Sequence, residues 1–144
     1  MDKSMRDIPT CYQFLKPLKK LARVSQAQLG GVACFVIKND AIISSGINYN
    51  PTGEPMEYVV DGKLVTRPEV IHAEIAALTA AQTNAIDVAG STLFVTMSPC
   101  LACATRIATS GITNLVYLYE WWDKASLDIL HGAGIATHHL KEER

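Results

Sequence analysis

The chain has 144 residues, of which 49% are hydrophobic, and a formal net charge of −1. This length predicts a single domain over 1–144, and the near-neutral charge gives no electrostatic reason to expect a nucleic-acid or anionic membrane partner. No apolar run reaches the length of a membrane span, and residues 1–9 lack a signal-peptide core. We therefore expect a soluble, cytoplasmic protein whose residues 1–9 form a flexible terminus.

The first predicted element is a helix over 10–28, in which Pro17 marks either a kink or the true start. Its basic residues are expected to form a solvated face instead of a polyanion site; they are Lys16, Lys19, Lys20 and Arg23. The apolar run 31–37 predicts a strand buried on both faces, and 41–46 predicts the returning antiparallel strand.

Residues 48–53 are rich in turn formers and predict a loop. The following segment, 56–66, predicts a β-hairpin because Asp61-Gly62 separates two β-prone runs. This hairpin is interpreted either as a flap over a site or as a plain surface feature.

The second half of the chain alternates between helices and strands. Helices are predicted over 70–83, 100–110 and 123–131, strands over 92–97 and 112–119, and a final short strand or helix over 135–140. Gly111 suits the C-terminal cap of the second of these helices. A hairpin followed by alternating strands and helices indicates an α/β fold with a mixed sheet covered by helices.

Four side chains with the chemistry of a metal site lie where two of these helices begin. His72, Cys100 and Cys103 suit a zinc ion and leave its fourth position for water, as in catalytic zinc sites. Zinc lowers the pKa of such a water to near neutrality, and Glu74 is placed to carry protons beside it. Two alternatives remain: a structural zinc site completed by His131, His138 or His139, and a redox dithiol formed by the two cysteines.

The two motifs, His72-Ala73-Glu74 and Pro99-Cys100-Leu101-Ala102-Cys103, resemble the H-x-E and P-C-x-x-C signature of the zinc-dependent cytidine deaminase superfamily. Together with the loop Gly46–Gly53, they most resemble small viral or phage deoxycytidylate (dCMP) deaminases. The resemblance covers roughly 12–135. It implies a three-layer α-β-α sandwich around a five-stranded mixed sheet, one zinc ion per subunit, and deamination of dCMP to dUMP for thymidylate synthesis.

The resemblance also assigns roles to individual residues. It implies that Glu74 is the proton shuttle, that the Ala73 N–H holds the base carbonyl, and that the Ser98 carbonyl, next to Pro99, accepts the exocyclic amine. It further places Asn48 at the sugar. The remaining implied contact is Trp121 or Trp122 near the ring or phosphate. Because basic residues of the family pattern are missing from this chain, the candidate phosphate ligands are instead Arg106, Lys63, Arg67 and Lys124.

Family members are commonly homohexamers, activated by dCTP and inhibited by dTTP, so the resemblance implies a similar oligomer and Mg²⁺ with a regulatory nucleotide. Ile47 and Tyr49 depart from the loop of the family, and its Cys-x-Arg element is absent, which leaves regulation and phosphate recognition open. Alternative substrates are dCTP, a free nucleoside, or adenosine in transfer RNA, and a non-catalytic nucleotide binder is a further alternative. For a viral protein, the host cytoplasm is the expected location.

Overall fold

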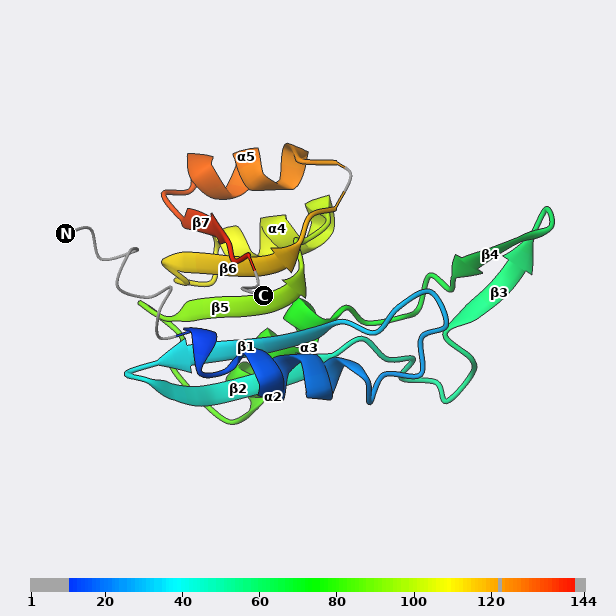
Figure 1. The fold of residues 1–144 in the computed structure, drawn as a ribbon, viewed down its shortest axis with the longest axis horizontal. Helices are drawn as coiled ribbons and strands as arrows, with labels where there is room; N and C mark the ends of the chain where they lie inside the picture. The colour runs from blue at the N-terminus through cyan, green and yellow to red at the C-terminus, as the bar shows by residue number, and fades with distance from the viewer. Residues whose placement is uncertain (1–10, 122, 142–144) are drawn as a thin grey trace.

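The computed structural model describes residues 11–121 and 123–141 (Figure 1). Its five-stranded sheet has the order β2-β1-β5-β6-β7. The strands are β1 (Ala33–Lys38), β2 (Ala41–Ile47), β5 (Thr92–Met97), β6 (Asn114–Tyr119) and β7 (Ala136–His139). Strand β1 is antiparallel to β2 and β5, whereas β5, β6 and β7 run parallel. The predicted mixed sheet is confirmed.

Helices cover both faces of this sheet. Helices α3 (Ala73–Thr83), α4 (Leu101–Ala108) and α5 (Ala125–Gly132) pack on one face, and α2 (Leu15–Ala22) packs on the other (Figure 1). Strand β1 is buried on both sides because its side chains alternate: Cys34 and Val36 face the three-helix side, and Phe35 and Ile37 face α2. The three-layer arrangement expected from the resemblance is therefore present.

The predicted hairpin consists of β3 (Glu57–Val60) and β4 (Lys63–Thr66), which project from the body of the molecule (Figure 1). Asp61 and Gly62 have φ values of 51° and 78°, which two-residue type I′ turns require. The base of the hairpin is anchored: Met56 is buried, and the Glu57 carboxylate accepts the backbone N–H of Leu29 at 3.2 Å.

The structure corrects several predicted boundaries. Helix α2 spans only 15–22 of the predicted 10–28, with Pro17 in its first turn, where a missing N–H is tolerated. Helix α3 begins at Ala73 instead of Val70 because Ile71 forms a β-bridge with Tyr49. The ambiguous last element is the strand β7. The flexible terminus predicted for 1–9 lies outside the described residues.

Among the described residues, no helix has both the length and the apolar character needed to cross a membrane.

Candidate active site

The N-terminus of α3 is held in place by contacts with β2 and with the loop that follows it. His72 is the N-cap of α3, and the preceding residue, Ile71, exchanges two backbone hydrogen bonds with Tyr49, at 2.8 and 3.0 Å. Gly46 lies directly beneath the helix: a Cβ built on it would be 2.5 Å from both the Ala73 carbonyl oxygen and the Ala77 nitrogen. Only glycine therefore lets β2 approach closely enough to support this end of α3.

The N-terminus of α4 follows the carboxyl end of β5. Pro99 is fully buried, Cys100 is the N-cap of α4, and Cys103 is buried in the first turn. A proline immediately before the N-cap keeps the chain extended up to the helix start. The carboxyl ends of strands in α/β sheets commonly carry ligand sites, and both motifs meet at this end of β5.

The donor atoms of His72, Cys100 and Cys103 lie within 4.8 Å of one another. His72 Nδ1 is 3.3 Å from Cys103 Sγ and 3.5 Å from Cys100 Sγ. Tetrahedral zinc with its usual bond lengths places a nitrogen and a sulfur ligand about 3.6 Å apart. The three residues therefore fit zinc by their donor types and by their separations.

A fourth protein ligand is not supplied by the other histidines of the described chain. His131 Nε2 is 2.7 Å from Thr137 Oγ1, and His139 Nε2 is 2.8 Å from the Leu118 carbonyl oxygen. The metal-ligand cluster found among the described residues contains His72, Cys100 and Cys103 alone. A three-residue ligand set leaves one coordination position open, which is the arrangement of catalytic zinc sites.

The pKa values of the two cysteine thiols in the site are shifted in opposite directions. A hydrogen bond with Cys103, and a second with His72, lower the pKa of Cys100 to about 3. The hydrogen bond between the two cysteines is also the main reason that the pKa of Cys103 is raised, and burial of Cys103 adds to this shift. The metal-free site thus carries one thiolate and one thiol, and binding of a divalent metal to both sulfurs releases a proton.

Glu74 is only 4% exposed, although it lines the cavity beside the ligand cluster. Burial raises the pKa of Glu74 to about 7. A carboxyl group with this pKa exchanges protons readily in both directions at neutral pH, as a general acid and base requires. The structure therefore gives Glu74 the environment of a proton-transfer residue.

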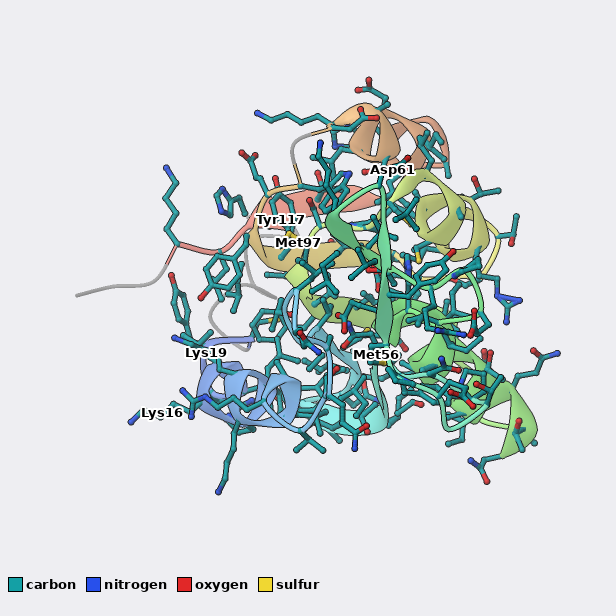
Figure 2. The ribbon with its side chains drawn as sticks, turned by 90° about the vertical axis from the view of Figure 1, so that its right-hand side faces the viewer. Lys16, Lys19, Met56, Asp61, Met97 and Tyr117 are labelled. Atoms are coloured by element: carbon teal, nitrogen blue, oxygen red, sulfur yellow. The ribbon has the colours of Figure 1, made fainter. Side chains whose placement is uncertain are left out.

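A cavity of about 450 Å³ opens next to these groups. This volume is within the range of small-molecule sites. Its lining includes the predicted residues His72, Ala73, Glu74, Asn48, Ser98, Cys100 and Trp121. Figure 2 looks onto this end of the molecule, where Met97, another lining residue, lies at the end of β5. Thr66 is the only residue of the β3–β4 hairpin among the lining residues described.

Two of the lining residues also support the cavity wall. Asn48 Oδ1 accepts the N–H of Val32 at 2.9 Å, and its Nδ2 donates to the Gly30 carbonyl at 3.3 Å. Ser98 Oγ accepts the backbone N–H of Trp121 at 2.6 Å. Both side chains therefore position neighbouring chain segments, a role that their motifs did not predict.

Other predicted substrate contacts are not brought to the cavity. Arg106 is in the last turn of α4 and donates to Gln82 Oε1 at 3.3 Å. Arg67 pairs with Glu69 at 2.8 Å, and Lys124 lies 3.6 Å from a carboxylate oxygen of Glu120. Pro99, Arg106, Lys63, Arg67 and Lys124 are all outside the cavity lining. Trp122 lies outside the described residues.

Sequence reasoning missed the basic side of the cavity. Lys19 and Arg23, which we expected on a solvated helix face, both line it. Their spacing of four residues on a helix was the available signal, because it puts both side chains on one face. What the sequence did not indicate was which face turns toward the metal site.

Comparison with known proteins agrees with this site. Residues 10–119 match the model of the cytidine and deoxycytidylate deaminase zinc-binding region. The deoxycytidylate deaminase of Enterobacteria phage T4 is 43% identical over 51% of this chain, a match that covers only 39% of the T4 protein. That of Mycobacterium phage D29 is 32% identical over 74% of this chain and 92% of its own length.

Among solved structures, the dCMP deaminase of cyanophage S-TIM5 in complex with dCMP and dUMP superimposes with a TM-score of 0.79 at 28% identity, covering 99% of both chains. The family match extends over most of the chain and includes both halves of the ligand cluster and Glu74. The chain therefore belongs to the cytidine and deoxycytidylate deaminase family.

Proposed function

We propose that this chain is a zinc-dependent hydrolytic deaminase that converts dCMP to dUMP. The observation that carries the proposal is the joining of His72, Cys100 and Cys103 to the buried Glu74 on the wall of one cavity. The cyanophage relative, solved with dCMP and dUMP, supports this choice of substrate. The ion would be held by His72, Cys100 and Cys103. When bound, it would lower the pKa of a water molecule to near neutrality.

Glu74 moves the protons of the reaction. Its carboxylate takes a proton from the water that adds to C4 of the cytosine ring and delivers it to N3. Glu74 then takes the proton of the hydroxyl group now on C4 and passes it to the exocyclic amine; the bond from C4 to that nitrogen breaks, ammonia leaves, and C4 becomes the carbonyl of dUMP. Glu74 suits this role because it is buried on the cavity wall beside the residues that would hold the ion, within the same cavity that receives the base.

Backbone groups at the two helix starts orient the base. Ala73 is the first residue of α3, so its N–H has no partner within the helix and suits the carbonyl O2. The carbonyl of Ser98, at the end of β5, suits the exocyclic amine. Ser98 is itself held by two hydrogen bonds, since its N–H donates to the Tyr119 carbonyl and its Oγ accepts the Trp121 N–H.

The test is a steady-state comparison of zinc-loaded protein on dCMP, dCTP, deoxycytidine and cytidine, with a tRNA anticodon stem-loop as a further substrate. We expect ammonia release from dCMP to be the fastest. Turnover of the stem-loop alone would favour the tRNA adenosine deaminase alternative, whereas a protein inactive on every pyrimidine substrate would refute the proposal. The net charge of −1 makes extensive polyanion binding unfavourable.

We extend the proposal to the remaining properties implied by the resemblance: a homo-oligomer, with a hexamer favoured, located in the cytoplasm, or in the host cytoplasm if the protein is viral. Regulation by dCTP and dTTP with Mg²⁺ belongs to the same proposal. Assaying dCMP turnover with and without dTTP and Mg²⁺ tests the regulation, and light scattering tests the assembly.

A further inference from the structure

Helix α2 and its C-cap residue, Arg23, contribute two cationic side chains to the lining of the cavity that contains the proposed metal site. Lys19 and Arg23 both line it, together with Ala22 between them. Residues four apart on a helix share a face, so the two cations act on the same region of the cavity. Glu74 is the one acidic residue among the lining residues that the structure describes.

The end of α2 is fixed in position relative to the rest of the cavity. Gly31 packs against the Ala22 carbonyl so closely that a Cβ built on Gly31 would lie 2.0 Å from that oxygen. The residues on either side of Gly31 are in turn bound by the side chain of Asn48. The segment that connects α2 to β1 is therefore held at one end by its contact with α2 and at the other by hydrogen bonds to the loop after β2.

The other candidate cations lie away from the cavity. Arg67 pairs with Glu69, Lys124 lies beside Glu120, and Arg106 donates to Gln82. None of them lines the cavity. An anionic group on a ligand bound in this cavity can therefore interact with the positive charges of Lys19 and Arg23.

We propose that Lys19 and Arg23 bind the 5′-phosphate of the substrate and make this enzyme selective for a nucleotide over a nucleoside. The inference rests on the proposed deaminase function. A phosphate monoester carries about −1.5 to −2 charges at neutral pH, which two cations balance. Arginine can bind two phosphate oxygens at once and lysine adds a mobile point charge. A triphosphate carries more negative charge than the pair can balance, so the pair suits dCMP better than dCTP.

The experiment measures kcat/KM for dCMP and for deoxycytidine with zinc-loaded Lys19→Ala, Arg23→Ala and the double variant. Alanine has the highest helix propensity, so α2 is expected to remain folded. Each single substitution should lower kcat/KM for dCMP about tenfold and the double about 100-fold, whereas kcat/KM for deoxycytidine should change less than about twofold.

Lys16→Ala is the matched control. Lys16 is an exposed residue of the same helix, absent from the cavity lining, and in Figure 2 it extends outward from α2. This variant removes the same charge and should leave both kcat/KM values unchanged. The charge-preserving pair Lys19→Arg and Arg23→Lys should retain most of the activity on dCMP.

A second measurement, product inhibition, is used in case the turnover of deoxycytidine is too slow to measure. Competitive inhibition by dUMP should weaken about 100-fold in the double variant, whereas inhibition by deoxyuridine should not change. Equal losses with nucleotide and nucleoside, or an unchanged kcat/KM for dCMP, would overturn the inference. Failure of the wild-type protein to deaminate either substrate would instead refute the proposed function, so the two failures are distinguishable.

Discussion

Replacing Glu74 with glutamine should stabilise the metal-free protein while abolishing most of its activity. Glu74 is 4% exposed, and burial raises its pKa from 4.5 to about 7. Because the pKa is higher in the folded state, the contribution of this group to stability is present below pH 4.5 and is lost as the pH rises through 7. Glutamine has a similar shape and carries no charge that burial would desolvate. The stability of the variant should therefore not fall as the pH rises through 7.

The size of the effect follows from the shift. Each pKa unit corresponds to about 1.4 kcal/mol, so ionised Glu74 costs the folded state about 3 kcal/mol at high pH. Integrated over the titration, the free energy of unfolding of Glu74→Gln relative to wild type should rise by about 2.5 kcal/mol between pH 5 and 8.5. The metal-free protein is required because a bound cation changes the field at the carboxylate.

The assay is urea unfolding of both proteins in a chelator at several pH values, with deaminase activity measured separately after zinc loading. Turnover of dCMP should fall about 10²- to 10⁴-fold, as expected when a general acid and base is lost, and zinc content should stay unchanged. The control is Glu69→Gln: the hydrogen bond from Arg67 lowers the pKa of Glu69, so that variant should lose stability near neutral pH. A stability difference for Glu74→Gln that does not vary with pH would refute the argument.

Three further predictions follow from the site and its supports. Cys103→Ala should abolish tight zinc binding, measured by competition with a chromogenic chelator, and should remove the increase in Tm that zinc gives the wild type. Gly46→Ala should cost about 1–3 kcal/mol in urea unfolding because its Cβ would overlap the start of α3, whereas Gly132→Ala, with nothing within 4 Å, should be neutral or stabilising. Asn48→Ala should cost about 2 kcal/mol of stability because it leaves the Val32 N–H and Gly30 carbonyl without their partner, while Asn48→Asp should restore only the bond from Val32.

The fold and the metal site were largely predictable because their signals are local in the sequence. Strand β5 has the predicted bounds, since an apolar run ending in Ser98-Pro99 specifies both its burial and its end. The three residues that the structure brings together as a candidate metal site were recognised from two short motifs at predicted helix starts. By contrast, the start of α3 was misplaced because Ile71 pairs with Tyr49, and a bridge between distant residues leaves no local pattern.

The residues that line the cavity were less predictable, because the lining depends on how elements on the two faces of the sheet meet at its edge. Arg106 was a candidate because it follows Cys103 closely in the sequence, but it lies six residues after Cys100, which is about 9 Å along a helix axis. The axis of α4 leads away from the cavity, so a cation near its end is carried toward Gln82. Helix α2 lies on the opposite face of the sheet, yet its C-terminal end brings Lys19 and Arg23 to the cavity.

The proposed metal site and the proposed phosphate site are supported by different parts of the hydrophobic core. The metal ligands and Glu74 depend on α3 and α4, whose starts are fixed by Gly46, by the Tyr49–Ile71 bridge and by the buried Pro99. The cationic pair depends on α2, which packs in a separate cluster around Leu18 on the other face of the sheet. Because α2 packs in one cluster and α3 and α4 in the other, we expect a substitution of Lys19 to leave the proposed metal ligands and Glu74 in place. Under the proposal, Lys19 and Arg23 supply the cationic groups that the absent Cys-x-Arg element would otherwise provide, from a cluster separate from that of Glu74.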